Sequence, residues 1–241
     1  AGLPRTGTTS LKAALEILGL KPCLHYADVM QETYPCTQSR RWKQALSLYG
    51  DEHKAARQAL LRQIFEQGRY AATLAYPASV FVQDLVEIYP DTQVVHSIRS
   101  STAVWKNSVD SAMRPVESGY SGRTLLALWT RLLKPSSLRP DLVAWGRRQF
   151  GAGYRDANNA QLYEGYNEFV KEVVPPERLL PDFESTAGWG PLCDLLGVPV
   201  PVDEHGEPIP YPRLNDRATM ENRRKARVTR GLMYWAIVVG I

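Results

Sequence analysis

Gly2-Leu-Pro-Arg-Thr-Gly-Thr-Thr-Ser-Leu11 opens the chain with a glycine-rich turn that runs directly into an amphipathic helix. The glycines allow a tight turn, and the backbone N–H groups that follow can converge on an anion at the helix N-terminus. An ordinary turn that caps a helix is the alternative interpretation. The anion site is favoured because one guanidinium and several hydroxyls cluster in the same turn, on Arg5, Thr6, Thr8, Thr9 and Ser10.

The glycine spacing of this turn is that of the ATP-binding loop GxxxxGK[ST], with one change. Thr8 stands at the position of the lysine. Without that lysine, and with no obvious acidic magnesium ligand at the end of a strand, ATP hydrolysis is disfavoured. The remaining donors suit a terminal phosphate or sulfate that is held by hydrogen bonds, and no metal is required.

Short apolar strands alternate with amphipathic helices along the rest of the chain. Helical spacing is found over 11–18, 77–88, 162–173 and 189–196, and strand patterns over 70–75, 93–98 and 178–183. Another helix after residue 98 is expected to turn Val104, Trp105, Ser108 and Val109 inward. This alternation predicts the α/β fold class, as a three-layer α/β/α P-loop fold with a central parallel sheet. The fold is expected to be a single domain over residues 1–230. Residues 31–69 are expected to be helical, and 114–157 to form an irregular lid or insertion.

Composition narrows the function classes. The 241 residues are 44% apolar and 22% charged, as in folded globular domains, and the net charge is only +4. That mild excess suits an anionic small ligand or an acidic membrane face and argues against a nucleic-acid partner. The three cysteines and four histidines lack metal-ligand spacing, so no metal site is predicted, and a reducing, cytoplasmic compartment is the simplest interpretation.

Both ends of the sequence carry an expectation. Because a strand normally precedes such a turn, we expect the natural chain to extend a few residues before Ala1. Residues 231–241 are wholly apolar and follow a basic run, but a helix needs about 20 residues to cross a bilayer. Two interpretations stay open for this segment: a buried terminal element, or a truncated membrane anchor that attaches a cytoplasmic protein to membranes.

The segment from Pro4 to Leu11 resembles the 5′-phosphosulfate loop of sulfotransferases that use 3′-phosphoadenylyl sulfate (PAPS), with the pattern Pro-[Lys/Arg]-[Ser/Thr]-Gly-Thr-Thr. Further similarity is to the branch of this family common in fungi, protists and bacteria. It lies, in order, in residues 22–26, 76–77, 89–91 and 189–197. The resemblance covers roughly residues 1–115 and 160–215, and it implies a transferase with PAPS as donor substrate.

This resemblance also implies roles for individual residues. Arg5 would contact the bridging oxygen between phosphate and sulfate, and the 5′-phosphate would be bound by Thr6, Gly7, Thr8, Thr9 and Ser10. Arg99, at the end of a predicted strand, and Ser108 would bind the 3′-phosphate. Ser108 lies one residue beyond the family's usual spacing, so either one residue is inserted or Asn107 takes its place; Trp105 favours the insertion.

The reaction also needs a general base for a hydroxyl or amine acceptor. His25 is the candidate, since the chain can return it toward the opening loop after the first helix; a structural core histidine is the alternative. Asp28 and Glu32 are weaker candidates. Relatives in this branch often carry an Asp at the position of Ala75, so its absence raises the question of efficient catalysis.

Three hypotheses follow from the sequence. The first is a sulfotransferase that moves a sulfuryl group from PAPS to a small-molecule or lipid acceptor, with Arg5 and His25 as catalytic residues. The second is a nucleotide kinase or NTPase. The third is a catalytically impaired, membrane-associated P-loop protein, prompted by Ala75 and the apolar C-terminal segment.

Overall fold

The computed structural model describes residues 1–31, 37–113 and 138–214. Short parallel strands connect through helices, as the alternating sequence pattern requires. The strands are β1 (Cys23–His25), β2 (Ala72–Leu74), β3 (Val94–Ser97) and β4 (Leu179–Phe183). The α-helices are α1 (Thr8–Ile17), α2 (Tyr26–Gln31), α3 (Thr37–Ser47), α4 (Lys54–Gly68), α5 (Val82–Ile88), α6 (Thr102–Met113), α9 (Arg139–Phe150), α10 (Asn159–Val173) and α11 (Gly190–Leu196). Short 3₁₀ turns are η1 (Asp51–His53), η2 (Ala78–Phe81), η3 (Pro176–Arg178) and η4 (Ser185–Ala187).

Parallel pairing joins the strands two by two. β1 lies beside β2, with Leu24 opposite Thr73, and β3 lies beside β4, with Val94 opposite Leu179. Within the described residues the parallel strands form two small sheets of two strands each. The start of the chain adds to the second pair: the Ala1 amino group donates to the Val95 carbonyl over 2.6 Å, and the Ala1 carbonyl accepts from the Ser97 amide over 2.8 Å.

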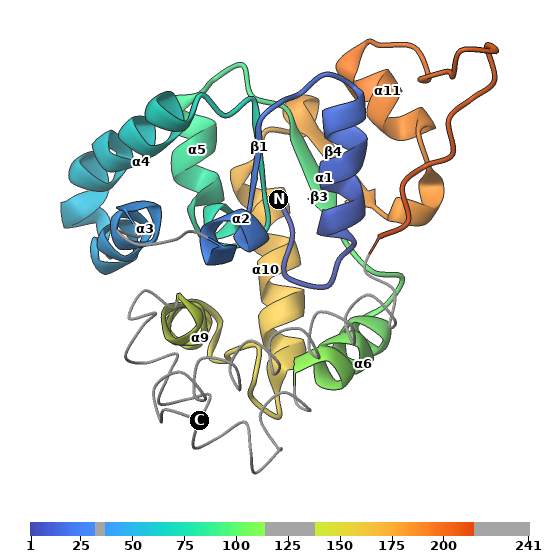
Figure 1. Ribbon diagram of the computed structural model, residues 1–241. Coiled ribbons are helices and arrows are strands. Elements are labelled where there is room, and N and C mark those ends of the chain that lie inside the picture. The colour runs from blue at the N-terminus through green and yellow to red at the C-terminus, as the bar shows by residue number, and fades with distance from the viewer. Residues whose placement is uncertain (32–36, 114–137, 215–241) are drawn as a thin grey trace, which may run out of the picture.

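Two apolar clusters lie on opposite faces of the strands. Neighbouring strand residues divide between them: Cys23 faces one cluster with α1 and α11, and Leu24 faces the other with α3, α4, α5, α6, α9 and α10. Val94 and Val95 divide in the same way, as the two-residue period of a strand requires. Figure 1 shows α4 and α5 on one side of the strands and α11 on the other. The predicted α/β class with helices on both faces is therefore confirmed.

Several local predictions differ from the structure. Residues 139–150 form a regular helix inside the segment that was expected to be irregular, and residues 114–137 of that segment lie outside the described part of the chain. The strand predicted over 70–75 is shorter, because buried Ala75 adopts a left-handed φ of 57° that ends it. Val104 is 45% exposed and does not face the core, whereas Trp105 and Val109 do.

The apolar C-terminal segment 231–241 lies outside the described residues. Among the helices that the structure describes, none combines the length and the apolar character needed to cross a membrane.

Candidate anion-binding site

The opening loop packs closely against the end of β3. A Cβ on Gly2 would overlap the Ser97 hydroxyl, so only glycine allows this approach. Gly7 has a left-handed φ of 83° and directly precedes α1, and a Cβ there would overlap Ser185. These two glycines let the loop turn sharply and present the first N–H groups of α1 at its open end.

Thr6 holds the loop in this shape. Its hydroxyl is buried, donates to the Leu3 carbonyl over 2.8 Å and lies 2.9 Å from the Ser97 hydroxyl. These bonds occupy the Thr6 side chain inside the protein. Its contribution to anion binding is therefore expected to come from the backbone N–H.

Arg5, Arg99 and Ser108 come together beside the loop. The Arg5 Nε donates to the Ser108 hydroxyl over 3.2 Å, and the Arg99 Nε donates to the Arg5 carbonyl over 2.7 Å. Burial lowers the pKa of Arg5, and the neighbouring positive charge of Arg99 lowers it further. An anion bound here would offset that repulsion. Asn107 is exposed, so the helix phase turns Ser108 toward the loop, as the Trp105 position suggested.

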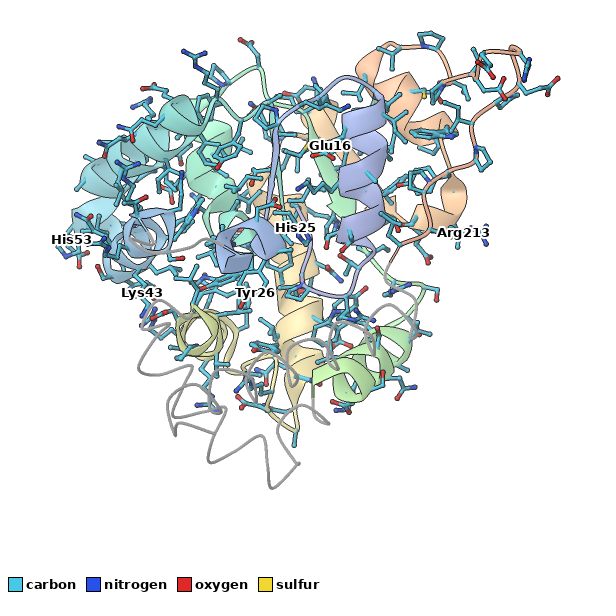
Figure 2. The ribbon with its side chains drawn as sticks, in the orientation of Figure 1. Glu16, His25, Tyr26, Lys43, His53 and Arg213 are labelled. Carbon is cyan, nitrogen blue, oxygen red and sulfur yellow. The ribbon has the colours of Figure 1, made fainter. Side chains whose placement is uncertain are left out.

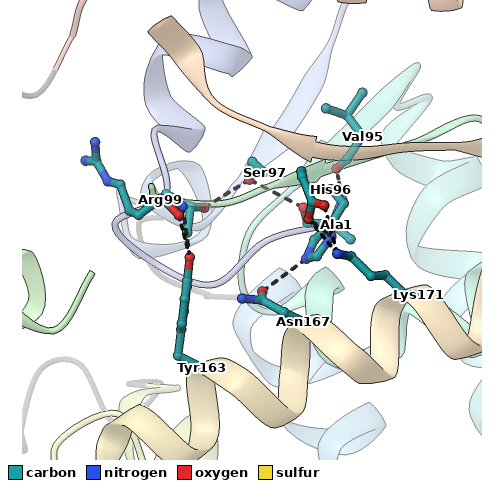
Figure 3. Close-up of polar contacts among 10 residues, drawn as sticks. Ala1, Val95, His96, Ser97, Arg99, Tyr163, Asn167 and Lys171 are labelled. Carbon is teal, nitrogen blue, oxygen red and sulfur yellow. Dashed lines mark hydrogen bonds and ion pairs between the residues drawn. The ribbon is translucent and has the colours of Figure 1, made fainter. Parts of the chain in front are cut away.

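Two aromatic residues brace this cluster. The Arg99 N–H donates to the Tyr163 hydroxyl over 2.9 Å, and that hydroxyl donates to the Arg99 carbonyl over 3.2 Å. Figure 3 shows Tyr163 reaching from α10 to the end of β3. Its ring stacks on Trp105 at 4.7 Å, and the Trp105 indole donates to the Pro4 carbonyl over 2.9 Å. The sequence pattern predicted that Trp105 faces inward but did not identify Tyr163. In the sequence Tyr163 is only a tyrosine on the inner face of a predicted helix.

His25 lies at the carboxyl end of β1, close to the loop. Its Nε2 is 3.2 Å from the Thr8 hydroxyl, and its Nδ1 accepts from the Ala27 N–H over 3.1 Å. Asp28 accepts from the His25 N–H over 2.9 Å and from Lys12 of α1 over 2.7 Å. Figure 2 places His25 and Tyr26 where β1 passes into α2. The expected return of His25 toward the loop is therefore present, while Glu32 lies outside the described residues.

Ser10 connects the first turn of α1 to a distant segment. The Leu214 N–H donates to the Ser10 hydroxyl over 2.9 Å, and that hydroxyl lies 3.4 Å from the Leu214 carbonyl. Upstream of Leu214, the Trp189 indole donates to the Ile209 carbonyl over 2.6 Å, which holds this segment against α11. The Leu214 contact was not predicted, because the residues are far apart in sequence and no local pattern joins them.

Metal binding is not provided for in the part of the chain described here. Within residues 1–31, 37–113 and 138–214, no three His, Cys, Asp or Glu side chains are grouped so that they could hold a metal ion. The site instead offers guanidinium groups, hydroxyls and backbone N–H donors, which are the groups that bind phosphate or sulfate directly.

Comparisons with known proteins identify the family of this chain. The family model described as "Sulfotransferase domain" matches residues 1–220. "Ava biosynthesis cluster protein M" of Aspergillus versicolor is 31% identical over 212 residues, which are 84% of this chain and 76% of that protein. With the match extending over the loop, both strand pairs and all the described helices, the chain belongs to the sulfotransferase domain family.

Proposed function

We propose that the protein transfers a sulfuryl group from PAPS to a hydroxyl or amine of an acceptor. The acceptor oxygen or nitrogen forms a bond to sulfur while the bond from sulfur to the bridging phosphate oxygen breaks. The acceptor proton passes to water, and adenosine 3′,5′-bisphosphate leaves with the electron pair of the broken bond. Such a transfer depends on in-line positioning and on donors that meet developing negative charge.

One observation carries this proposal: the convergence of Arg5, Arg99 and Ser108 beside the start of α1. An anion with two separated phosphate groups matches a site in which the helix N-terminus and a second basic cluster lie side by side. The 5′-phosphate would be surrounded by Thr6, Gly7, Thr8, Thr9 and Ser10. The 3′-phosphate would be bound by Arg99 and Ser108.

Arg5 has the central catalytic role in this proposal. Its guanidinium is half-buried and is linked to Ser108, so it can meet the charge that develops on the leaving phosphate. A fixed positive charge in a partly desolvated site stabilises that charge more strongly than a solvated one.

The acceptor is proposed to be a small molecule. The Aspergillus versicolor relative is named for a biosynthesis cluster, and a small-molecule acceptor is in keeping with that name. A kinase or NTPase is not favoured, because Thr8 occupies the position of the P-loop lysine.

Calorimetric titration with adenosine 3′,5′-bisphosphate, beside ATP with magnesium, tests the donor site. The wild-type protein should bind the bisphosphate and give no heat with ATP. Arg5→Ala should weaken bisphosphate binding about 10-fold or more, because it removes a charged hydrogen-bonding group. Arg62→Ala, on the exposed face of α4, is the matched control and should bind as the wild type does.

Either of two results would contradict the proposed donor. The first is binding and turnover of ATP without affinity for the bisphosphate, which would favour the kinase hypothesis. The second is equal bisphosphate affinity of the Arg5 and Arg62 variants.

A further inference from the structure

The His25 ring has a defined tautomer in this structure. A backbone N–H can only donate, so the contact from Ala27 over 3.1 Å requires a lone pair on Nδ1. The proton of the neutral ring therefore resides on Nε2, which faces the Thr8 hydroxyl at 3.2 Å. In this bond Nε2–H donates and Thr8 Oγ accepts.

The direction of that bond decides what Thr8 can do. Because Thr8 Oγ accepts from the ring, its own hydroxyl hydrogen remains to be donated to a further acceptor. Thr8 is the first residue of α1, where an anion at the opening loop would lie. Both residues are more than nine-tenths buried, Thr8 at 8% and His25 at 9% exposed, so water competes little for these bonds.

The surroundings of His25 oppose a reversal of this arrangement. The backbone N–H of His25 donates to Asp28, which also accepts a hydrogen bond from Lys12 of α1. The backbone of His25 is therefore fixed relative to the loop. A proton on Nδ1 would point at the N–H of Ala27, and two hydrogens cannot share a hydrogen bond. The ring would therefore have to rotate and break its bond to Thr8 before Nδ1 could carry a proton. Nε2 already carries its proton. Neither nitrogen is thus prepared to accept a proton from an acceptor substrate.

We propose that His25 is a positioning residue, which orients the Thr8 hydroxyl toward the phosphate of the bound donor, and that it is not the general base. The inference rests on the proposed function, since the anion is the donor of the sulfuryl group. Three hydrogen bonds run in one direction: from Ala27 N–H to His25, from His25 to Thr8, and from Thr8 to the phosphate. Bonds that point the same way strengthen one another.

Two substitutions of His25 separate the roles. His25→Gln keeps an N–H donor at about the position of Nε2 but has no ring to accept a proton, whereas His25→Ala removes the donor. We expect His25→Ala to weaken binding of adenosine 3′,5′-bisphosphate about 3- to 10-fold, the effect of one lost hydrogen bond, and His25→Gln to stay within about 2-fold of the wild type. Calorimetry gives the affinities, and thermal unfolding of each variant shows that it is folded.

A double-mutant cycle with Thr8→Val shows whether His25 acts through Thr8. Valine keeps the branched shape and loses the hydroxyl, so His25→Ala should cost no further affinity in the Thr8→Val background. Additive losses from the two substitutions would overturn the inference. So would a His25→Ala variant that binds the bisphosphate as the wild type does.

Failure of this inference can be distinguished from failure of the proposed function. If the wild type does not bind the bisphosphate, the proposed function is wrong and the inference falls with it. If the wild type binds and sulfates an acceptor, while His25→Gln binds normally but has lost turnover as fully as His25→Ala, then His25 is the base and only the inference is overturned.

Discussion

At the scale of single residues, Arg99 depends on a side chain from another part of the chain. β3 ends at Ser97, and beyond it the N–H and the carbonyl of Arg99 both bond to the Tyr163 hydroxyl. The Tyr163 hydroxyl thus makes the hydrogen bonds to the Arg99 backbone that a neighbouring strand would otherwise make. The Arg99 side chain is thereby directed to the Arg5 carbonyl.

Tyr163→Phe should therefore weaken the donor site without changing any residue that touches the donor. It removes both hydrogen bonds to Arg99 and keeps the stacking on Trp105. We expect bisphosphate affinity to fall about 3- to 10-fold and the free energy of unfolding to fall by about 1 kcal/mol. Calorimetry and urea unfolding measure the two effects.

Tyr76→Phe is the matched control for Tyr163→Phe. The Tyr76 hydroxyl is buried and donates to the Leu138 carbonyl over 2.8 Å, on the side of α9. Its loss should lower stability by a similar amount and leave bisphosphate affinity unchanged. Equal affinities of the two variants would show that the Tyr163 hydroxyl does not support Arg99.

At the scale of elements, a largely buried ion pair joins α4 to α5 and to the loop after α3. Arg57 makes two bonds to Asp84, of 2.8 and 3.1 Å, and its Nη1 donates to the carbonyls of Leu48 and Gly50. The Asp84 side chain is only 8% exposed. Arg57 therefore satisfies a buried carboxylate and two loop carbonyls at once, which fixes where α3 ends relative to α4.

Arg57→Met should destabilise the fold strongly, because it leaves the buried Asp84 carboxylate without its partner. We expect the free energy of unfolding to fall by about 3–5 kcal/mol, and the double variant with Asp84→Leu to recover part of it. Urea unfolding of the single and double variants measures both values.

Lys54→Met provides the comparison on the same two helices. Lys54 pairs with Glu87 over 2.8 Å, but both side chains are more than a third exposed, at 39% and 38%. Solvent screens this pair, so its loss should cost only a small fraction of the Arg57 effect. Similar losses from Lys54→Met and Arg57→Met would mean that burial does not decide the contribution of the Arg57 pair.

At the scale of the whole molecule, the buried His96 is expected to make stability depend on pH. The ring is fully buried in β3, and its Nε2 bonds to Asn167 over 3.0 Å (Figure 3). Nδ1 lies 3.9 Å from Asp182, which pairs with Lys171. Burial lowers the pKa of His96 from 6.5 to about 4, although the bond to Asn167 acts in the opposite direction.

Stability should therefore fall as the pH falls from 6.5 toward 4. In this range the unfolded chain takes up a proton on His96 that the folded chain does not, so protonation favours unfolding. Between pH 7 and pH 5 the contribution of His96 is about 2 kcal/mol.

Urea unfolding of the wild type and His96→Gln at both pH values isolates this contribution. The two proteins differ only at His96, so the wild type should lose about 2 kcal/mol more than the variant on acidification. Equal losses would show that His96 does not carry the pH dependence.

Short-range patterns predicted much of the architecture. α1 ends within two residues of Gly19, α10 ends just before Pro175-Pro176, and α11 ends at Gly197 in a left-handed conformation. Such signals are local, because proline and glycine restrict or free the backbone where they stand. The helix over 139–150 was missed, since its arginines, glycine and proline mask an apolar face that only packing against α3 and α10 reveals.

By itself the sequence determined the opening loop, the alternation of strands and helices, and the candidate donors, because glycine freedom and side-chain periodicity act over a few residues. The position of Trp105 favoured Ser108 over Asn107, but only the tertiary structure brought Ser108 to Arg5 and Tyr163 to Arg99. It also decided which His25 nitrogen faces Thr8. Each of these contacts joins segments that are distant in the chain. Their geometry is set by how the helices and strands pack, and no local pattern encodes it.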